Sequence, residues 1–129
     1  MRTDELNALS NRVLDAAYRV HTQFGPGLLE SAYTACFVYE LQKAGMDVKT
    51  EVPVPVVYDG LKLADVGFRI DVLVADEIVV EMKSLEAIAP VHLSQLTSYL
   101  KLSSRRLGFL LNFNVESLRD GIYRRVNGF

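Results

Sequence analysis

The sequence predicts an α/β fold, in which a mixed central sheet is flanked by helices and extended by an extra N-terminal helix and a short C-terminal helix. Three observations favour this fold. Residues 4–44 place apolar side chains three or four positions apart, as amphipathic helices do. Residues 48–83 contain runs of β-branched and aromatic residues bounded by turn signals. A helical segment that begins at Pro90 then separates the third strand from a fourth.

Two helices are expected before the first strand. The first covers residues 4–22, where apolar residues recur at helical spacing: Leu6, Leu9, Val13, Ala16, Ala17 and Val20. The second covers residues 28–44, with Tyr33, Phe37 and Leu41 on its inner stripe. Glu30 belongs to this stripe, so its carboxylate is expected to point along the edge of the sheet. The alternative is that Glu30 only interacts favourably with the helix dipole in the first turn.

Four strands and two further helices are expected after residue 44. In chain order, the strands cover residues 48–58, 66–74, 78–83 and 106–113, and the helices cover residues 90–102 and 115–126. The turn signal Asp59-Gly60 predicts a hairpin in which residues 61–63 return along the first strand. Pro53 and Pro55 indicate that this first strand lies at an edge of the sheet.

Charged residues interrupt two of these apolar strands. Asp71 lies within residues 66–74, and Glu81 and Lys83 lie within the third strand. Because alternate residues of a strand point the same way, Glu81 and Lys83 share one face. A carboxylate and an ammonium on one surface suit a metal ligand beside a cationic partner.

The loop between these two strands decides whether the acids meet. If residues 75–77 form a three-residue loop, Val74 pairs with Ile78 and Asp71 falls opposite Glu81 on the same face. A two-residue loop would put the acids on opposite faces. Facing carboxylates repel, and a cation relieves the repulsion. The alternative is an exposed sheet edge whose charges only prevent aggregation.

The helix that begins at Pro90 has a polar stripe beside its buried one. His92, Gln95 and Tyr99 recur at helical spacing. Gln95 and Tyr99 present two hydrogen-bonding groups on one face, which indicates that they contact something near the acids. A solvated amphipathic face is the alternative, and we favour it for His92.

Composition limits the class of protein. A chain of 129 residues, half of them apolar, suits one domain spanning residues 1–129. No apolar stretch is long enough to span a bilayer and the N-terminus lacks a signal-peptide pattern, so we expect a cytoplasmic protein without membrane contact. The single cysteine, Cys36, is expected to be a small buried hydrophobe rather than a catalytic thiol.

Charge is unevenly distributed along the chain. The net charge is −2, with −6 over residues 1–100 and +4 over residues 101–129. The basic end, which includes Arg124 and Arg125, could contact phosphates. The alternative is that these arginines only keep a terminal helix soluble or pair with the acidic part of the chain.

The acids and their spacing resemble a known superfamily. Asp71 followed by Glu81-Met82-Lys83, preceded by a helical Glu30, resembles the PD-(D/E)XK nuclease superfamily. The α-β-β-β-α-β order over residues 28–113 is similar to its restriction-endonuclease-like core. The run from Gln95 to Tyr99 looks like the Q-x-x-x-Y element of its exonuclease branch.

A narrower resemblance covers nearly the whole chain. Gly27-Leu28-Leu29-Glu30-Ser31-Ala32-Tyr33 looks like the signature of the bacterial GxxExxY protein family. The likeness runs from the N-terminal helix to the segments Asn112-Phe113-Asn114 and Val126-Asn127-Gly128.

The superfamily resemblance implies roles for particular residues. Asp71 and Glu81 would be metal ligands, and Lys83 would polarise the scissile phosphate or position the attacking water. Glu30 would complete the metal shell, often through water. Gln95 and Tyr99 would orient the nucleic-acid backbone or the lysine. One departure precedes Asp71, where Ile70 replaces the proline of the pattern, and that proline is frequently absent.

These residues indicate a divalent-metal-dependent nuclease acting on DNA. Hard carboxylate oxygens favour Mg²⁺ or Mn²⁺, whereas the two histidines and the cysteine lack the spacing of a zinc site. The alternative is a non-catalytic module that binds nucleic acid or a partner on a nuclease-like fold. Small size and near-neutral charge favour such a module, with binding surface borrowed from a homodimer or a protein partner.

Overall fold

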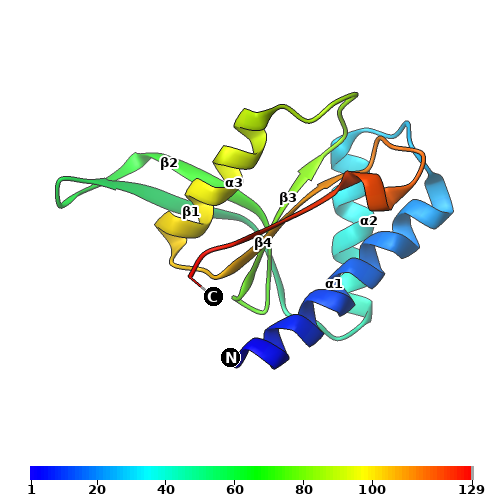
Figure 1. Cartoon of the computed structure of the whole chain (residues 1–129), viewed down its shortest axis with the longest axis horizontal. Helices are drawn as coiled ribbons and strands as arrows, with labels where there is room; N and C mark the ends of the chain where they lie inside the picture. The colour runs from blue at the N-terminus through cyan, green and yellow to red at the C-terminus, as the bar shows by residue number, and fades with distance from the viewer. Residues whose placement is uncertain (129) are drawn as a thin grey trace.

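The computed structural model describes residues 1–128, apart from the side chains of residues 64–66, and confirms the α/β fold (Figure 1). Its elements are α1 (Thr3–Phe24), α2 (Glu30–Lys43), β1 (Val48–Tyr58), β2 (Leu61–Val74), β3 (Ile78–Lys83), α3 (Pro90–Ser103), β4 (Leu107–Asn112), a 3₁₀ turn (Leu118–Gly121) and β5 (Ile122–Val126). The strands form one sheet in the order β1-β2-β3-β4-β5. The sheet is mixed, since β3 and β4 run parallel and the other pairs are antiparallel.

Two hydrophobic cores lie on opposite faces of the sheet. Figure 1 shows α1 and α2 on one side of the sheet and α3 on the other. The first core holds the apolar stripes of α1 and α2, and every stripe residue predicted for α1 is buried in it. The second core lies under α3, where Leu96 and Leu100 pack against Val79 and Leu110. The sheet is therefore sandwiched by helices, as predicted.

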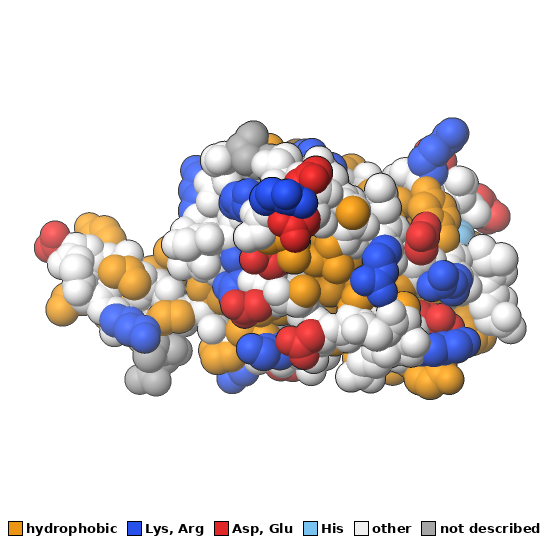
Figure 2. All heavy atoms as spheres, turned by 90° about the horizontal axis from the view of Figure 1, so that it is seen from below, with side chains coloured by type: hydrophobic (Ala, Val, Ile, Leu, Met, Phe, Trp, Pro, Cys, Tyr) orange, Lys and Arg blue, Asp and Glu red, His pale blue; other side chains and the backbone are white. Residues whose placement is uncertain are grey.

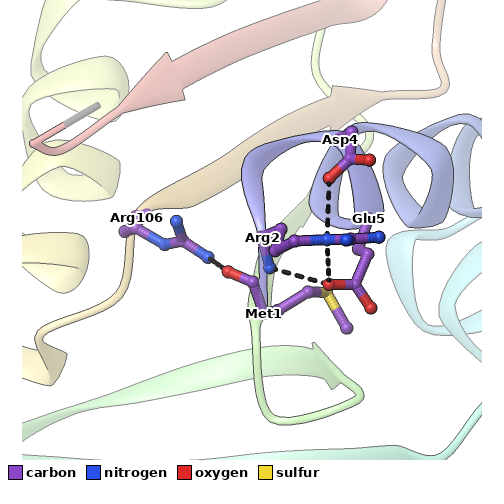
Figure 3. A network of polar contacts seen from close by, with 5 residues as sticks. All are labelled: Met1, Arg2, Asp4, Glu5 and Arg106. Carbon is purple, nitrogen blue, oxygen red and sulfur yellow. Dashed lines mark hydrogen bonds and ion pairs between the residues drawn. The ribbon is translucent and has the colours of Figure 1, made fainter.

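The N-terminus of α1 is anchored by a small polar network (Figure 3). The Arg2 backbone N–H donates to the Glu5 carboxylate, and the Arg2 guanidinium lies 3.3 Å from Asp4 and 3.1 Å from Glu5. The Arg106 guanidinium donates to the Met1 carbonyl. Because Arg106 directly precedes β4, this contact ties the start of the first helix to the beginning of β4.

The β1–β2 hairpin projects beyond the helices (Figures 1 and 2). Asp59 and Gly60 both have positive φ angles, 53° and 78°, and form the predicted tight turn between Tyr58 and Leu61. Tyr58 and Leu61 are 72% and 64% exposed, and Figure 2 shows hydrophobic side chains at the end of the projection. β2 is one continuous strand, whereas the sequence predicted a short return followed by a separate strand.

The predicted C-terminal helix over residues 115–126 is wrong. Residues 118–121 form a 3₁₀ turn, and β5 pairs antiparallel with β4. All six residues of β4 are buried, so its outer edge needs a partner to satisfy its backbone groups, and the β-branched and aromatic residues of β5 supply one. Gly121 allows the close approach, since a Cβ there would lie 2.0 Å from the Asn112 carbonyl oxygen.

Candidate functional site

The register of the β2–β3 hairpin is the one predicted for a three-residue loop. Val74 pairs with Ile78 and Val72 with Val80. In the loop, the Arg105 guanidinium holds Asp76 through its carboxylate at 2.9 Å and its carbonyl at 3.1 Å. The next residues in this register are Asp71 and Glu81, so the acids meet on neighbouring strands.

Asp71 and Glu81 close the end of the β2–β3 ladder with their side chains. The Asp71 N–H donates to Glu81 Oε1 at 3.4 Å, and the Met82 N–H donates to Asp71 Oδ2 at 2.9 Å. We call Asp71 and Glu81 the carboxylate pair.

The electrostatics of the pair are set by burial. Glu81 is only 6% exposed, and burial raises the pKa of its carboxyl to about 9, with a further increase from the neighbouring Asp71 and an opposing effect of Lys83. Without a cation, Glu81 therefore keeps its proton at neutral pH. A bound cation would favour the ionised form, so a cation could replace this proton at the pair.

A hollow of about 410 Å³ opens beside Asp71. It lies between α2 and β1 and is lined by Glu30, Ser31, Thr34, Ala35, Val38, Thr50, Glu51 and Asp71. Partial burial and then Asp71 raise the pKa of Glu30, and Lys83 lowers it, so Glu30 shares the field of the carboxylate pair. The structure thus brings Glu30 to the acids, but its side chain is exposed at the mouth of the hollow rather than on the core stripe.

The loop before α2 fixes the position of Glu30. The Tyr33 hydroxyl donates to the Gly25 carbonyl at 2.5 Å and accepts the Leu28 N–H at 3.1 Å. The Ser84 hydroxyl donates to the Leu28 carbonyl at 2.7 Å. Because Ser84 directly follows Lys83, these bonds couple the helical acid to the end of the strand that carries the lysine.

Asn112 holds the chain just beyond Lys83. It is 2% exposed, its Oδ1 accepts the Leu85 N–H and its Nδ2 donates to the Leu85 carbonyl, both at 3.0 Å. The Phe113 N–H also donates to the Lys83 carbonyl at 3.0 Å. The backbone around Lys83 is therefore held on both sides.

Lys83 itself is half-buried, and no Asp or Glu within residues 1–128, leaving aside the undescribed side chain of Asp65, lies within 4.0 Å of its ammonium. Its charge nevertheless lowers the pKa of both Glu30 and Glu81, so it lies near them. The ammonium is thus available to a further anion at the site.

Tyr99 is the residue of α3 that the structure brings to the acids. Its ring packs on Phe68, with centroids 4.7 Å apart, and partial burial followed by Glu81 and Asp71 raises the pKa of its hydroxyl. Gln95, one turn earlier, is exposed. His92 has a structural role instead, since its Nδ1 accepts the Ala89 N–H at 2.9 Å at the start of α3.

The C-terminal arginines lie away from the carboxylate pair. Arg124 and Arg125 are on β5, two strands from β3 in the sheet order. Any contact that they make with nucleic acid would be separate from the acids.

Three residues near the site were not predicted from the sequence. Glu51 lines the hollow with Asp71, Phe68 supports Tyr99, and Asn112 holds the backbone after Lys83. An asparagine inside an apolar strand was the visible signal for Asn112, because a buried amide needs partners. Glu51 and Phe68 gave no such signal.

The donor chemistry fits a hard divalent cation held by two acids. Within the described part of the chain, no group of three Asp, Glu, His or Cys side chains is close enough together to hold a metal ion. Asp71 and Glu81 are in contact and offer carboxylate oxygens, with Glu30 nearby. Carboxylate oxygen suits Mg²⁺ or Mn²⁺.

A family model described as the PD-(D/E)XK nuclease superfamily matches residues 7–126. The matched range includes the carboxylate pair, Glu30, Lys83, Gln95 and Tyr99. The comparisons with curated proteins and with solved structures found no match. Among the described residues, no helix has the length and apolar character needed to cross a membrane.

Proposed function

Because the chain belongs to the PD-(D/E)XK nuclease superfamily, we propose that it is a divalent-metal-dependent nuclease that hydrolyses phosphodiester bonds in DNA. The observation that carries the proposal is the contact between Asp71 and Glu81, with the pKa of Glu81 raised to about 9, beside the available ammonium of Lys83. Such a pair favours the binding of a cation, and hydrolysis of a phosphodiester requires a cation that neutralises charge on the phosphate.

The roles divide between the carboxylate pair and its neighbours. Asp71 and Glu81 would hold Mg²⁺ or Mn²⁺, which neutralises charge on the phosphate and lowers the pKa of a bound water. Glu30, which lines the hollow, would reach such an ion through water. Lys83 contacts a phosphate oxygen or the attacking water with a fixed positive charge.

Residues of α3 orient the substrate in this proposal. The raised pKa of Tyr99 keeps its hydroxyl protonated, so it donates a hydrogen bond to a phosphate oxygen. Gln95, exposed one turn earlier, contacts the nucleic-acid backbone. Packing on Phe68 limits the positions open to the Tyr99 ring.

We also propose that the chain is a bacterial, cytoplasmic, single-domain member of the GxxExxY family. The support is the segment from Gly27 to Tyr33, in which the Tyr33 hydroxyl organises the loop that presents Glu30. In this view, the spacing of the motif reflects the distance between a helical acid and the residue that anchors its loop.

A non-catalytic module that binds nucleic acid or a partner is the second candidate. The observation that favours it is that no group of three potential ligands lies together within the described residues. Two acids and a lysine can bind a polyanion through a cation without cleaving it.

Cleavage by a lysine variant distinguishes the two candidates. Wild type and Lys83→Ala are incubated at equal concentration with Mg²⁺ or Mn²⁺ and single-stranded, duplex and branched DNA and RNA. We expect cleavage of DNA by wild type and a loss of about 10²–10³ in rate for Lys83→Ala, as for removal of one electrostatic donor.

The control is Lys43→Ala, which removes an exposed lysine at the end of α2, outside the basic segment of residues 101–129, and should cut like wild type. Heat stability measured with and without Mn²⁺ should show that Lys83→Ala still binds the metal, because the lysine acts on the substrate. If no substrate is cut, or if Lys83→Ala cuts as fast as wild type, the nuclease proposal fails and the non-catalytic binding module becomes the proposed function.

A further inference from the structure

The two paired strands β1 and β2, which we call the β1–β2 ribbon, turn over at one point beside the site. Side chains that would continue on one face of the sheet lie on the opposite face beyond this point. In β2, Val72 packs in the core under α1 and α2, whereas Ile70 packs in the core under α3. In β1, Val48 packs with the first core and Val52 with the second. Residues an even number apart in a regular strand share a face. The ribbon therefore turns over between these residues.

The turnover occurs at Glu51 and Asp71. Thr50 pairs with Val72 and Val52 with Ile70, which leaves Glu51 and Asp71 facing each other between the two pairs. No residue is inserted here, so the exchange of faces does not come from a bulge. Glu51 has a φ angle of 53°, in the left-handed region that residues with a side chain adopt at an energetic cost.

This turnover sets the orientation of Asp71. The Asp71 N–H points to the Glu81 carboxyl, the Asp71 carboxylate accepts the Met82 N–H, and the same residue lines the hollow beside Glu30. The strained φ angle of Glu51 persists next to these Asp71 contacts, which indicates that the surrounding structure requires the left-handed conformation.

We infer that Glu51 is a positioning residue whose left-handed backbone, rather than its carboxylate, turns the ribbon over and holds Asp71 in the carboxylate pair. The inference rests on the proposed function where it treats Asp71 as a metal ligand. The Glu51 side chain is exposed, and its backbone carbonyl accepts a long hydrogen bond of 3.5 Å from Arg69.

Substitutions at Glu51 distinguish the effect of its backbone conformation from the effect of its carboxylate charge. Glu51→Gly and Glu51→Asn remove the carboxylate and accept a positive φ readily. Glu51→Gln removes only the charge. Glu51→Val and Glu51→Thr are β-branched and oppose the left-handed conformation, and Thr is the milder change if the Val variant does not fold.

The first readout needs no metal. Amide hydrogen exchange of the full chain, followed by NMR, reports whether the Met82 N–H is still held by Asp71. We expect the Gly, Asn and Gln variants to stay within about threefold of wild type. The Val and Thr variants should exchange about tenfold faster, as expected for loss of one hydrogen bond.

The second readout is the rise in melting temperature on adding Mn²⁺. We expect the Gly, Asn and Gln variants to keep the wild-type shift, and the Val and Thr variants to lose at least half of it. A Met82 amide that stays protected in Val and Thr would overturn the inference. So would a Gln variant that loses the Mn²⁺ shift with Met82 still protected, because the carboxylate would then be the active group.

The two readouts fail separately. If wild type shows no Mn²⁺ shift, the proposed metal site fails, and the Met82 amide alone decides whether Glu51 positions Asp71.

Discussion

Metal binding at the carboxylate pair should displace one proton, and the size of the effect follows from Glu81. A carboxyl must be ionised to bind a metal. Because the pKa of buried Glu81 is raised to about 9, each pH unit below that value weakens metal binding about tenfold. From pH 6 to pH 8, Mn²⁺ affinity should rise about 100-fold, or about 2.7 kcal/mol.

Isothermal titration calorimetry measures this directly. Mn²⁺ is titrated into wild type at pH 6, 7 and 8, each in two buffers with different heats of ionisation. The difference in heat between the buffers should correspond to one proton released per ion bound. Glu81→Gln cannot release that proton, so it should bind Mn²⁺ more weakly and without this steep dependence on pH.

Two results would refute the reasoning. A wild-type affinity that is flat between pH 6 and pH 8 would mean that Glu81 is already ionised. An equal pH dependence in wild type and Glu81→Gln would assign the proton to another group.

Three further outcomes are expected. Without metal, the folded state holds the Glu81 proton more tightly than the unfolded state. The contribution of Glu81 to stability is therefore fully present below about pH 4.5 and is lost at up to about 1.4 kcal/mol per pH unit towards pH 9. Denaturant unfolding at several pH values should show this slope in wild type and a flatter one in Glu81→Gln. Tyr33→Phe leaves two backbone groups of the loop before α2 without their hydrogen-bond partner, so the melting temperature should fall by about 4–8 °C. An unchanged melting temperature would mean that the Tyr33 hydroxyl does not anchor this loop. Gly121→Ala places a Cβ against the Asn112 carbonyl and should cost about 3 kcal/mol or more in urea unfolding, whereas a cost under about 1 kcal/mol would mean that the turn into β5 can relax.

The helices and the central hairpin could be predicted because local pattern and tertiary packing agree there. The apolar stripe of α1 is the buried one, and the pairing of Val74 with Ile78 is the only register that keeps both apolar faces of the hairpin inside. This register also brought Asp71 to Glu81. The central part of the candidate site could therefore be predicted from the apolar patterns of β2 and β3 and the length of the loop between them.

The rest depended on long-range geometry. Counted from the turn at Asp59-Gly60, Glu51 would lie opposite Phe68, but a register shift between Val54 and Val56 moves it opposite Asp71. No local pattern encodes that shift. β5 was missed for a similar reason. Its β-branched and aromatic residues are compatible with a strand, but its pairing depends on the open edge of β4, which no local pattern in residues 122–126 shows.

The short loop between β2 and β3 also bears on how the chain folds. Closing three residues costs little chain entropy, so pairing of Val74 with Ile78 can begin without the rest of the sheet. β4 joins β3 only after α3 has crossed over. An early hairpin therefore brings Asp71 and Glu81 together before α3 packs on the sheet. Because burial is the main cause of the raised pKa of Glu81, the proton or cation is taken up at neutral pH when the rest of the sheet and α3 bury this carboxyl, and not when the hairpin first closes.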